Sequence, residues 1–382
     1  MDEFRECDSC SLPAMQTPYR AAHGVPALRV LQRQESYYNK RRTLGGEKEE
    51  GLMGNIVLDV MGGDYAPGAQ VRGAIEALKE VSSDIYLVGQ ENRIREMLKD
   101  FTHSRLHIID APEVIEMDAK PSVACKKYPD SSMMKGMRFV KENKNSVFIS
   151  AGNSGAVMAS AVMVLERIQG ILRPAIAVVA KGVKGPFVLL DAGANTNCNW
   201  QHLCQFAVMG SICAALVTKK SNPSVGLLSN GSEPGKGTDA IVAANKVLSA
   251  SDLNFIGNIE GGDVLTGACD CIVCDGFVGN ILLKLAESFS EVLYMGFNSG
   301  SRFSLFKKLG KGFLKRMLNK FDYTEYGATH LLGLNGSVMV THGRANEKAI
   351  ENSILAAEEE IKAKVSFTIA NEISKYSGIL NI

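Results

Sequence analysis

A short loop rich in small hydrogen-bonding residues joins a predicted strand at 146–150 to a predicted helix at 156–168. The loop contains Gly152, Asn153, Ser154 and Gly155. A glycine loop between a strand and a helix presents backbone N–H groups and the positive end of the helix dipole. It can therefore hold a phosphate or a developing oxyanion, although an ordinary turn that needs glycine for its backbone angles has the same composition.

Further polar side chains follow other predicted strands. Side-chain amides that could complete an anion site belong to Asn195, Asn258 and Asn280. Lys236 or Arg173 could neutralise the charge of a phosphate. Strand-terminal carboxylates belong to Asp59, Asp191 and Asp275. These carboxylates could orient the donors or accept a proton from phosphate, but capping the following turn is an equally common use of aspartate. His342 lies after a strand and before a helix, where it could donate a proton or serve a structural role.

Strands and helices alternate from residue 55 onward. Strands are predicted at 56–60, 84–89, 106–110, 146–150, 174–180, 187–191, 224–229, 271–275 and 336–340, with a further strand and loop at 255–263. Helices are predicted at 71–81, 91–100, 131–141, 156–168, 200–217, 239–250 and 345–373. This alternation predicts a three-layer α/β/α fold with a mostly parallel sheet. Because such sheets bind ligands beyond the carboxyl ends of their strands, we expect the polar loops to gather at one edge.

The composition is that of a soluble globular protein. With 382 residues and a net charge of +1, the chain can form one large core or two domains and has no general attraction to nucleic acid. It contains no run of about eighteen uncharged apolar residues, so no membrane span is predicted. The nine cysteines are scattered through apolar stretches. They predict reduced, buried thiols, and we expect neither a metal site nor a cofactor.

Two terminal segments and one internal segment differ from the rest. Residues 1–52 lack hydrophobic periodicity and are predicted to be a disordered extension, with Met53 as the working start, while residues 377–382 form a short tail. Residues 300–320 interleave apolar and basic side chains within a predicted helical hairpin at about 285–325. Such a stretch can lie on anionic lipid or grip an acidic protein, while the alternative is a solvated hairpin that closes a dimer. The expected membrane contacts are Phe303, Leu305, Phe306, Lys307, Lys308 and Phe313.

Six motifs occur in a fixed order along the chain. They lie at 59–64 (with Gly62, Gly63 and Asp64), 150–156, 191–195, 257–261 (with Asn258 and Glu260), 275–280 and 342–343. This ordered set resembles the bacterial phosphate acyltransferase family over residues 53–376, and the first 52 residues lie outside the resemblance. Gly262 stands where that family usually carries a charged residue.

The resemblance implies a fold similar to phosphotransacetylase and isocitrate dehydrogenase, a protruding helical hairpin and a homodimer. It implies reversible transfer of a fatty acyl group from acyl-acyl-carrier-protein to inorganic phosphate. The acyl phosphate would then serve a membrane acyltransferase that acylates glycerol 3-phosphate. The enzyme would be cytoplasmic and would attach to the inner face of the plasma membrane through the apolar-tipped hairpin.

Phosphate is already a usable nucleophile at neutral pH, so the protein must mainly hold it beside the thioester and stabilise the oxyanion. This hypothesis places phosphate on Gly152, Asn153, Ser154 and Gly155, with Lys236 as the cation. The candidate catalytic residues are Asp191, Asn195, Asp275 and His342. The rest of the expected cleft consists of Asp59, Gly62, Gly63, Asp64, Asn258, Glu260 and Asn280.

Two other functions fit parts of this pattern. An NAD-linked dehydrogenase shares the fold neighbourhood, but no G-x-G-x-x-G follows the first strand with an acidic residue about twenty positions on. A non-catalytic binder of lipid or carrier protein could use the basic hairpin. Release of carrier thiol only in the presence of phosphate separates the enzyme from both alternatives.

Overall fold

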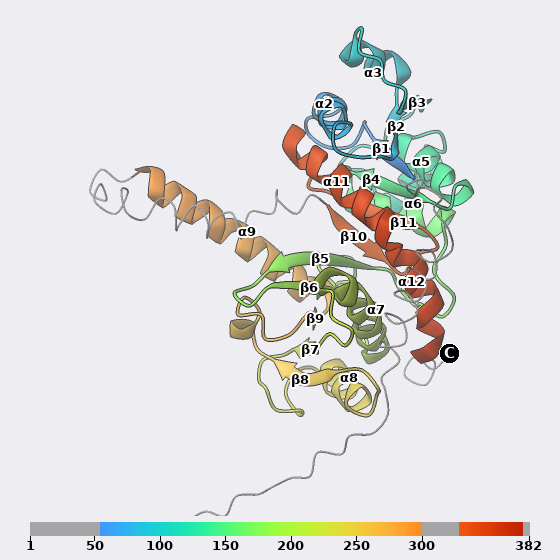
Figure 1. Ribbon diagram of the computed structural model, residues 1–382. Coiled ribbons are helices and arrows are strands. Elements are labelled where there is room, and N and C mark those ends of the chain that lie inside the picture. The colour runs from blue at the N-terminus through green and yellow to red at the C-terminus, as the bar shows by residue number, and fades with distance from the viewer. Residues whose placement is uncertain (1–53, 300–327, 377–382) are drawn as a thin grey trace, which may run out of the picture. The chain divides into compact units, whose positions relative to one another are not determined.

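One sheet of eleven strands organises the chain (Figure 1). The computed structural model describes residues 54–299 and 328–376, so the predicted N-terminal extension, the C-terminal tail and the tip of the predicted hairpin lie outside the described residues. The strands are β1 (Asn55–Asp59), β2 (Asp84–Gly89), β3 (Leu106–Asp110), β4 (Ser146–Ser150), β5 (Ala175–Lys181), β6 (Pro186–Leu190), β7 (Val225–Leu228), β8 (Phe255–Ile259), β9 (Cys271–Val273), β10 (Thr329–Leu332) and β11 (Ser337–Val340). Their order in the sheet is β3-β2-β1-β4-β11-β10-β5-β6-β9-β7-β8.

The sheet consists of two parallel blocks that run in opposite directions. β3, β2, β1, β4 and β11 form one block, and β6, β9, β7 and β8 form the other. Three successive antiparallel pairings, β11 with β10, β10 with β5 and β5 with β6, reverse the strand direction between the blocks. We call the edge with the carboxyl ends of β1, β4 and β11 the first edge. The carboxyl ends of β6, β7, β8 and β9 lie at the opposite edge, which we call the second edge.

This reversal corrects the expectation that all the polar loops gather at one edge of the sheet. Alternation of strands and helices predicts a parallel sheet, but it gives no sign of where direction reverses. The connections at 182–185 and 333–336 are too short to hold a crossover, which needs a dozen or more residues, so the strands that they join must be antiparallel.

Helices cover both faces of the sheet and complete the predicted three-layer architecture. They are α2 (Gly68–Ala77), α3 (Glu91–Leu98), α4 (Pro121–Lys127), α5 (Ser132–Glu142), α6 (Ser154–Val164), α7 (Trp200–Thr218), α8 (Asp239–Ser249), α9 (Gly276–Ser299), α11 (Glu347–Ala363) and α12 (Val365–Glu372), with short 3₁₀ helices at Gly261–Asp263 and Ile373–Tyr376. The helix predicted at 345–373 is broken at Lys364, which adopts a left-handed conformation between α11 and α12.

Strand alternation explains how the first block is buried on both faces. Ile56 and Leu58 of β1 point into one apolar cluster with α2 and α11. Val57, between them, points into the opposite cluster with α5 and α6. Successive strand residues face opposite sides of a sheet, so both faces of β1 require a helical cover.

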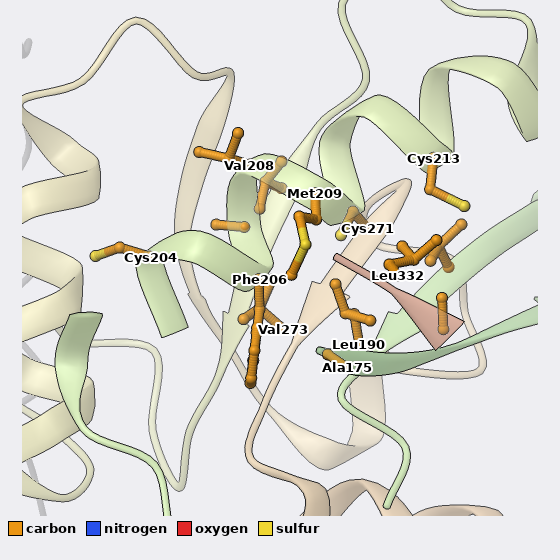
Figure 2. Close-up of a cluster of buried hydrophobic side chains, with 14 of the residues drawn as sticks. Ala175, Leu190, Cys204, Phe206, Val208, Met209, Cys213, Cys271, Val273 and Leu332 are labelled. Atoms are coloured by element: carbon orange, nitrogen blue, oxygen red, sulfur yellow. The ribbon is translucent and has the colours of Figure 1, made fainter. Parts of the chain in front are cut away.

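Helix α7 is the central helix of the second block (Figure 2). Phe206 and Met209 pack with Leu190 and Val273 of the sheet. Burying side chains of this size contributes about 1.5–3 kcal/mol each. Among the described helices, α7 alone is long and apolar enough to cross a membrane by composition, yet 67% of its apolar window is buried inside the fold. The sequence prediction of a buried helix at 200–217 is therefore confirmed, and α7 is a core helix.

The cysteines of the described segments are free thiols, and all but the half-buried Cys198 are buried. Burial raises the pKa of Cys204 and Cys213 to about 12, so these side chains behave as small apolar groups. Over residues 54–299 and 328–376, no group of three His, Cys, Asp or Glu side chains could hold a metal ion.

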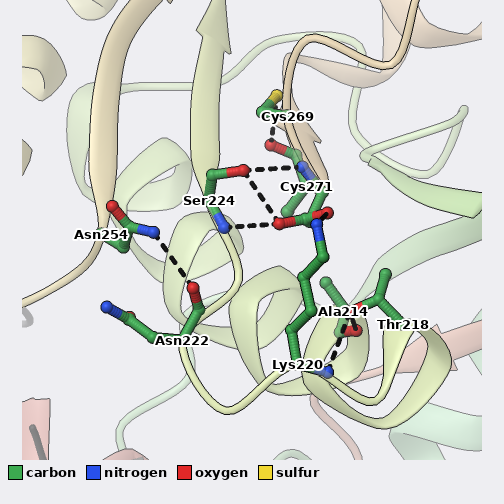
Figure 3. Close-up of polar contacts among 9 residues, drawn as sticks. Ala214, Thr218, Lys220, Asn222, Ser224, Asn254, Cys269 and Cys271 are labelled. Carbon is green, nitrogen blue, oxygen red and sulfur yellow. Dashed lines mark hydrogen bonds and ion pairs between the residues drawn. The ribbon is translucent and has the colours of Figure 1, made fainter. Parts of the chain in front are cut away.

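A polar cluster fixes the start of β9 (Figure 3). Lys220 Nζ donates to Asp270 Oδ1 at 2.7 Å, and Ser224 donates to Asp270 Oδ2 through both its N–H and its hydroxyl at 2.9 Å. Burial by itself raises the pKa of Asp270, but the hydrogen bonds from Lys220 and Ser224 outweigh it and lower the pKa below 3.8. The carboxylate therefore stabilises the fold when it is charged.

Asp270→Asn should lower the free energy of unfolding at neutral pH, and this loss should disappear in acid. Because the pKa of Asp270 is lowered in the folded chain, its contribution is present above pH 3.8 and is lost as the pH falls through the folded pKa. Urea titrations of both proteins between pH 7 and pH 3 measure the difference, with Asp118→Asn at an exposed site as control. A difference that stays constant over this range would contradict the assignment.

Candidate active site

The carboxylate of Asp59 lies at the first edge, completely buried at the end of β1. It accepts hydrogen bonds from Ser150 Oγ at 2.7 Å and from the N–H of Met61 at 3.0 Å. Burial raises the pKa of Asp59, and hydrogen bonds from Ser132, Ser150 and the N–H groups of Met61 and Gly62 act in the opposite direction. The carboxylate thus serves as a buried acceptor that joins the ends of β1 and β4.

Asn153 has a structural role that the sequence hypothesis did not assign to it. Its Oδ1 accepts from the N–H of Ala156 at 3.0 Å, so Asn153 is the N-cap of α6, and the helix begins two residues before its predicted start. Its Nδ2 donates to the carbonyl oxygens of Met117 at 2.7 Å and Ala119 at 3.2 Å. The prediction that Asn153 donates to phosphate is therefore corrected, because both ends of its amide are engaged.

Gly152 is engaged in the same way. Its N–H donates to Ser150 Oγ at 3.0 Å, so it is not a donor for a phosphate. The remaining two predicted residues, Ser154 and Gly155, form the first turn of α6. Within the part of the chain that the structure describes, their N–H groups and the exposed Ser154 hydroxyl donate to no other residue. The anion-binding capacity of this loop is thus concentrated at Ser154 and Gly155.

The loop after β1 packs directly against the end of β4 and the loop after β11. The N–H of Asp64 donates to the carbonyl oxygen of Gly343 at 2.8 Å, and Gln70 Nε2 donates to that of Gly62 at 2.6 Å. Gly63 has φ +98°, and a Cβ there would lie 3.0 Å from the Cβ of Ala151. Glycine is therefore required at this crossing. The structure thus brings Gly62, Gly63 and Asp64 to the first edge.

His342 also lies at the first edge, because it follows β11. Its Nδ1 accepts from the N–H of Arg344 at 3.1 Å, and its ring is half-buried. This position, just after the strand next to β4, is compatible with the predicted proton donor. The catalytic role of His342 stays a prediction.

Sequence reasoning missed Lys120 at the first edge. The residues on either side of it contact the α6 loop: the carbonyl oxygen of Ala119 accepts from Asn153, and a Cβ at Gly155 would lie 2.8 Å from Pro121 Cγ. The Lys120 side chain is exposed. The contact joins segments more than thirty residues apart in sequence. No local pattern marks such a contact in the sequence.

Asp191 lies at the second edge and is completely buried. Its Oδ1 accepts from the N–H groups of Ile176, Gly193 and Ala194 at 3.0–3.1 Å. Its Oδ2 accepts from the N–H and the side-chain amide of Asn195 at 2.7 and 2.9 Å. With five donors on one carboxylate, Asp191 has the geometry of the loop-capping role that the sequence left open.

Asn195 and Asp275 are part of the same structural unit. Asn195 Nδ2 also donates to the carbonyl oxygen of Pro174 at 2.7 Å, and the residue is buried. Asp275 Oδ1 accepts from the N–H of Val278 at 2.8 Å and so caps the first turn of α9. Asn280 is exposed one turn further along α9. The N–H of Gly276 donates to the carbonyl oxygen of Asn195 at 2.8 Å and so joins the loop after β6 to the start of α9. The predicted catalytic roles of Asn195 and Asp275 remain untested.

Asn258, Lys236 and Glu260 lie at the second edge as well. Asn258 is buried and donates to the carbonyl oxygens of Glu233 at 2.9 Å and Lys236 at 3.3 Å, while its Oδ1 accepts from Asn245 Nδ2. The N–H of Glu260 donates to Asp263 Oδ2 at 3.0 Å in a capping box. Lys236 follows β7 at the second edge, whereas the Ser154 loop follows β4 at the first edge. The predicted place of Lys236 in one phosphate site with that loop stays a prediction.

The predicted membrane contacts, Phe303, Leu305, Phe306, Lys307, Lys308 and Phe313, lie outside the described residues. The structure does show the helix that leads toward them. Leu282 and Leu283 of α9 pack against the sheet, whereas Ile281, Leu285 and Phe289 are exposed.

The chain is similar in sequence to a known protein family and to several known proteins. Residues 55–368 match the family described as "Fatty acid synthesis protein". The phosphate acyltransferase of Dictyoglomus turgidum is 42% identical over 328 residues, which cover 84% of this chain and 98% of the relative. That of Thermoanaerobacter pseudethanolicus is 42% identical over 332 residues, covering 86% and 99%.

Solved structures support the fold. A phosphotransacetylase from Streptococcus pyogenes superposes with a TM-score of 0.54 at 17% identity and covers 86% of this chain and 99% of that one. The EutD phosphotransacetylase of Staphylococcus aureus gives a TM-score of 0.51 at 16% identity, covering 82% and 95%. At this identity the similarity concerns the α/β architecture.

Proposed function

The chain belongs to the phosphate acyltransferase family, and from this premise we propose that it transfers a fatty acyl group from a thioester to inorganic phosphate. A phosphate oxygen attacks the thioester carbonyl, the carbon–sulfur bond breaks, and the thiolate leaves and takes up a proton. We propose acyl-acyl-carrier-protein as the donor, so the products are acyl phosphate and free carrier protein. The homodimer, and use of the product by a membrane glycerol-3-phosphate acyltransferase, are further expectations from the family resemblance.

The first turn of α6 is the observation that best supports a phosphate site. The Ser154 hydroxyl is exposed there beside the N–H groups of Ser154 and Gly155, which donate to no other described residue. Asn153 holds this turn in place. Its Oδ1 caps the N-terminus of α6, and its Nδ2 donates to the backbone of the 117–119 segment. A preformed set of donors at a helix N-terminus suits a dianion and keeps its position when charge develops.

Lys120 is the cation that we propose for this site in place of Lys236. Its neighbours Ala119 and Pro121 contact Asn153 and Gly155, and its own side chain is exposed. A lysine ammonium near the bound phosphate would offset part of its charge and of the charge that develops on the carbonyl oxygen. His342, at the same edge, is the proposed proton donor to the leaving thiolate.

Turnover of palmitoyl-acyl-carrier-protein by the full chain tests the proposal. We expect release of carrier thiol only when phosphate is added. Ser154→Ala should reduce kcat/KM for phosphate by about tenfold or more, because it removes a donor from a partly dehydrated anion site. Ser232→Ala, at an exposed serine of a loop at the second edge, is the matched control and should leave turnover unchanged. Binding of the carrier without thiol release would favour the non-catalytic binder instead.

We also propose that α9 carries the enzyme to an anionic membrane surface. Ile281, Leu285, Phe289 and Val292 recur at helical spacing and are 49–64% exposed. They form an apolar stripe on the stretch of α9 that precedes the basic segment at 302–320. Apolar side chains beside basic ones suit the interface of a bilayer with anionic lipid.

Phe289→Glu should reduce co-sedimentation with phosphatidylglycerol-containing vesicles by about tenfold, because it replaces an apolar contact with the bilayer by a negative charge that anionic lipid repels. Ser288→Glu adds the same charge at the neighbouring exposed position and is the matched control. A change of oligomeric state with unchanged vesicle binding would instead assign the stripe to a second copy of the chain.

A further inference from the structure

We propose that Ser150, held by the buried carboxylate of Asp59, is a positioning residue that sets phosphate affinity through the first turn of α6. The inference rests on the proposed phosphate site. Neither side chain touches a substrate in this account, and both act through the backbone of the loop that follows β4.

The connection runs through two hydrogen bonds of the Ser150 hydroxyl. Ser150 Oγ donates to Asp59 Oδ2 at 2.7 Å and accepts from the N–H of Gly152 at 3.0 Å. Gly152 immediately precedes Asn153, whose side chain caps α6. The hydroxyl therefore determines where the chain leaves β4 and, through the cap, where the donors of Ser154 and Gly155 point.

The Asp59 carboxylate links this loop to its neighbours. Both Ser150 and Asp59 are completely buried. Besides Ser150, the carboxylate accepts from Ser132 on α5 and from the N–H groups of Met61 and Gly62. A buried carboxylate is retained only where several donors compensate its desolvation, and here those donors come from three separate segments.

The loop after β1 and the loop after β4 pack backbone against backbone. A Cβ on Gly62 would lie 2.7 Å from the N and 2.9 Å from the Cα of Gly152. A Cβ on Gly152 would overlap the Cε of Met133. Because the backbones already touch, a shift of the β4 loop on loss of the Ser150 hydroxyl has no free space to relax into and is passed on to α6.

Kinetics of Ser150→Ala separate positioning from simple stabilisation. We expect KM for phosphate to rise about tenfold while KM for palmitoyl-acyl-carrier-protein stays within about twofold. Ser150→Thr keeps the hydroxyl and should restore most of the phosphate affinity. The control is Ser160→Ala, which removes another completely buried serine hydroxyl and its bond to the carbonyl oxygen of Val157. It should lower thermal stability by an amount similar to that of Ser150→Ala, without changing KM for phosphate.

Asp59→Asn provides a second, independent variant. If the two side chains act as one unit, the double variant Asp59→Asn/Ser150→Ala should raise KM for phosphate no more than the worse single variant does. Additive effects, or a KM for phosphate within twofold of the native value in Ser150→Ala, would overturn the inference and leave a stabilising role only.

Thermal stabilisation by inorganic phosphate distinguishes failure of this inference from failure of the proposed function. It needs no turnover and reports binding directly. Native chain that is stabilised by phosphate, with Ser150→Ala that is not, supports the positioning role even if acyl transfer is absent. Equal stabilisation of both proteins contradicts the positioning role while leaving the phosphate site intact. Native chain that neither turns over nor responds to phosphate contradicts both proposals.

Discussion

Gly279→Ala should lower the free energy of unfolding by about 3 kcal/mol or more and displace α9 from the sheet. A Cβ at this position would overlap the carbonyl oxygen of Asp191 and lie 2.9 Å from its carbonyl carbon and 3.1 Å from the Cα of Ala192. These are backbone atoms of a buried loop, so no side-chain rotation relieves the overlap. The first turn of α9 and the Asp191 loop cannot both keep their positions.

Urea denaturation measures this loss, and Gly262→Ala is the matched control. A Cβ at Gly262 meets no atom within 4 Å, and its backbone is not in the left-handed region, so we expect a change within about 0.5 kcal/mol. Equal stability of the two variants would mean that α9 does not start against the Asp191 loop as described.

Asp191→Ala should be the most destabilising single carboxylate change at either edge, at about 4 kcal/mol. The Asp191 carboxylate accepts five hydrogen bonds, four of them from backbone N–H groups. Its removal would leave these donors buried without an acceptor, and each such group costs about 1–3 kcal/mol before relaxation. We expect the variant to unfold at much lower urea concentrations.

Asp239→Ala, at an exposed first-turn position of α8, is the control and should cost at most about 1 kcal/mol. Activity at a temperature where Asp191→Ala stays folded adds a second test. If the folded variant retains near-native turnover, Asp191 is structural, as its hydrogen bonds indicate. A folded variant that is inactive would restore the catalytic role that the sequence suggested.

Much of the fold follows from local sequence pattern. Apolar runs such as 146–150 and 187–190 become buried strands because they lie between two helical layers. Helix 200–217 has apolar residues on all sides, and its residues 202–211 are correspondingly all buried. The reversal between the two blocks was missed, because strand direction depends on pairings between residues that are distant in sequence.

The candidate site was only partly predictable for the same reason. Residue type and position after a strand indicated Ser154 and Gly155 as residues with available donors, but placed them in the loop before the helix, which begins at Ser154. The same criteria could not show that the side-chain amide of Asn153 is hydrogen-bonded to the first turn of α6 and to the 117–119 segment. Nor could they show that Lys120 lies at the first edge and Lys236 at the second.

The roles of two buried aspartates could not be predicted from their positions in the sequence. Asp59 and Asp191 both end strands and both precede glycine-containing loops. The sequence left open whether they orient donors, accept a proton from phosphate or cap the following turn. Their hydrogen bonds point to orientation in both cases, because each carboxylate is buried and occupied by donors of its own loop. The burial of a carboxylate and the hydrogen bonds that it accepts depend on tertiary structure, and a position at the end of a strand does not specify them.

Transfer of heavy oxygen from labelled phosphate tests the central claim most directly. The full chain is incubated with palmitoyl-acyl-carrier-protein and phosphate labelled at every oxygen, and the products are weighed by mass spectrometry. We predict acyl phosphate that carries all of the labelled oxygens, formed in step with free carrier thiol, because a phosphate oxygen forms the new bond to the acyl carbon. Free fatty acid without label, or thiol release at the same rate without phosphate, would show that water is the acceptor and would contradict the account.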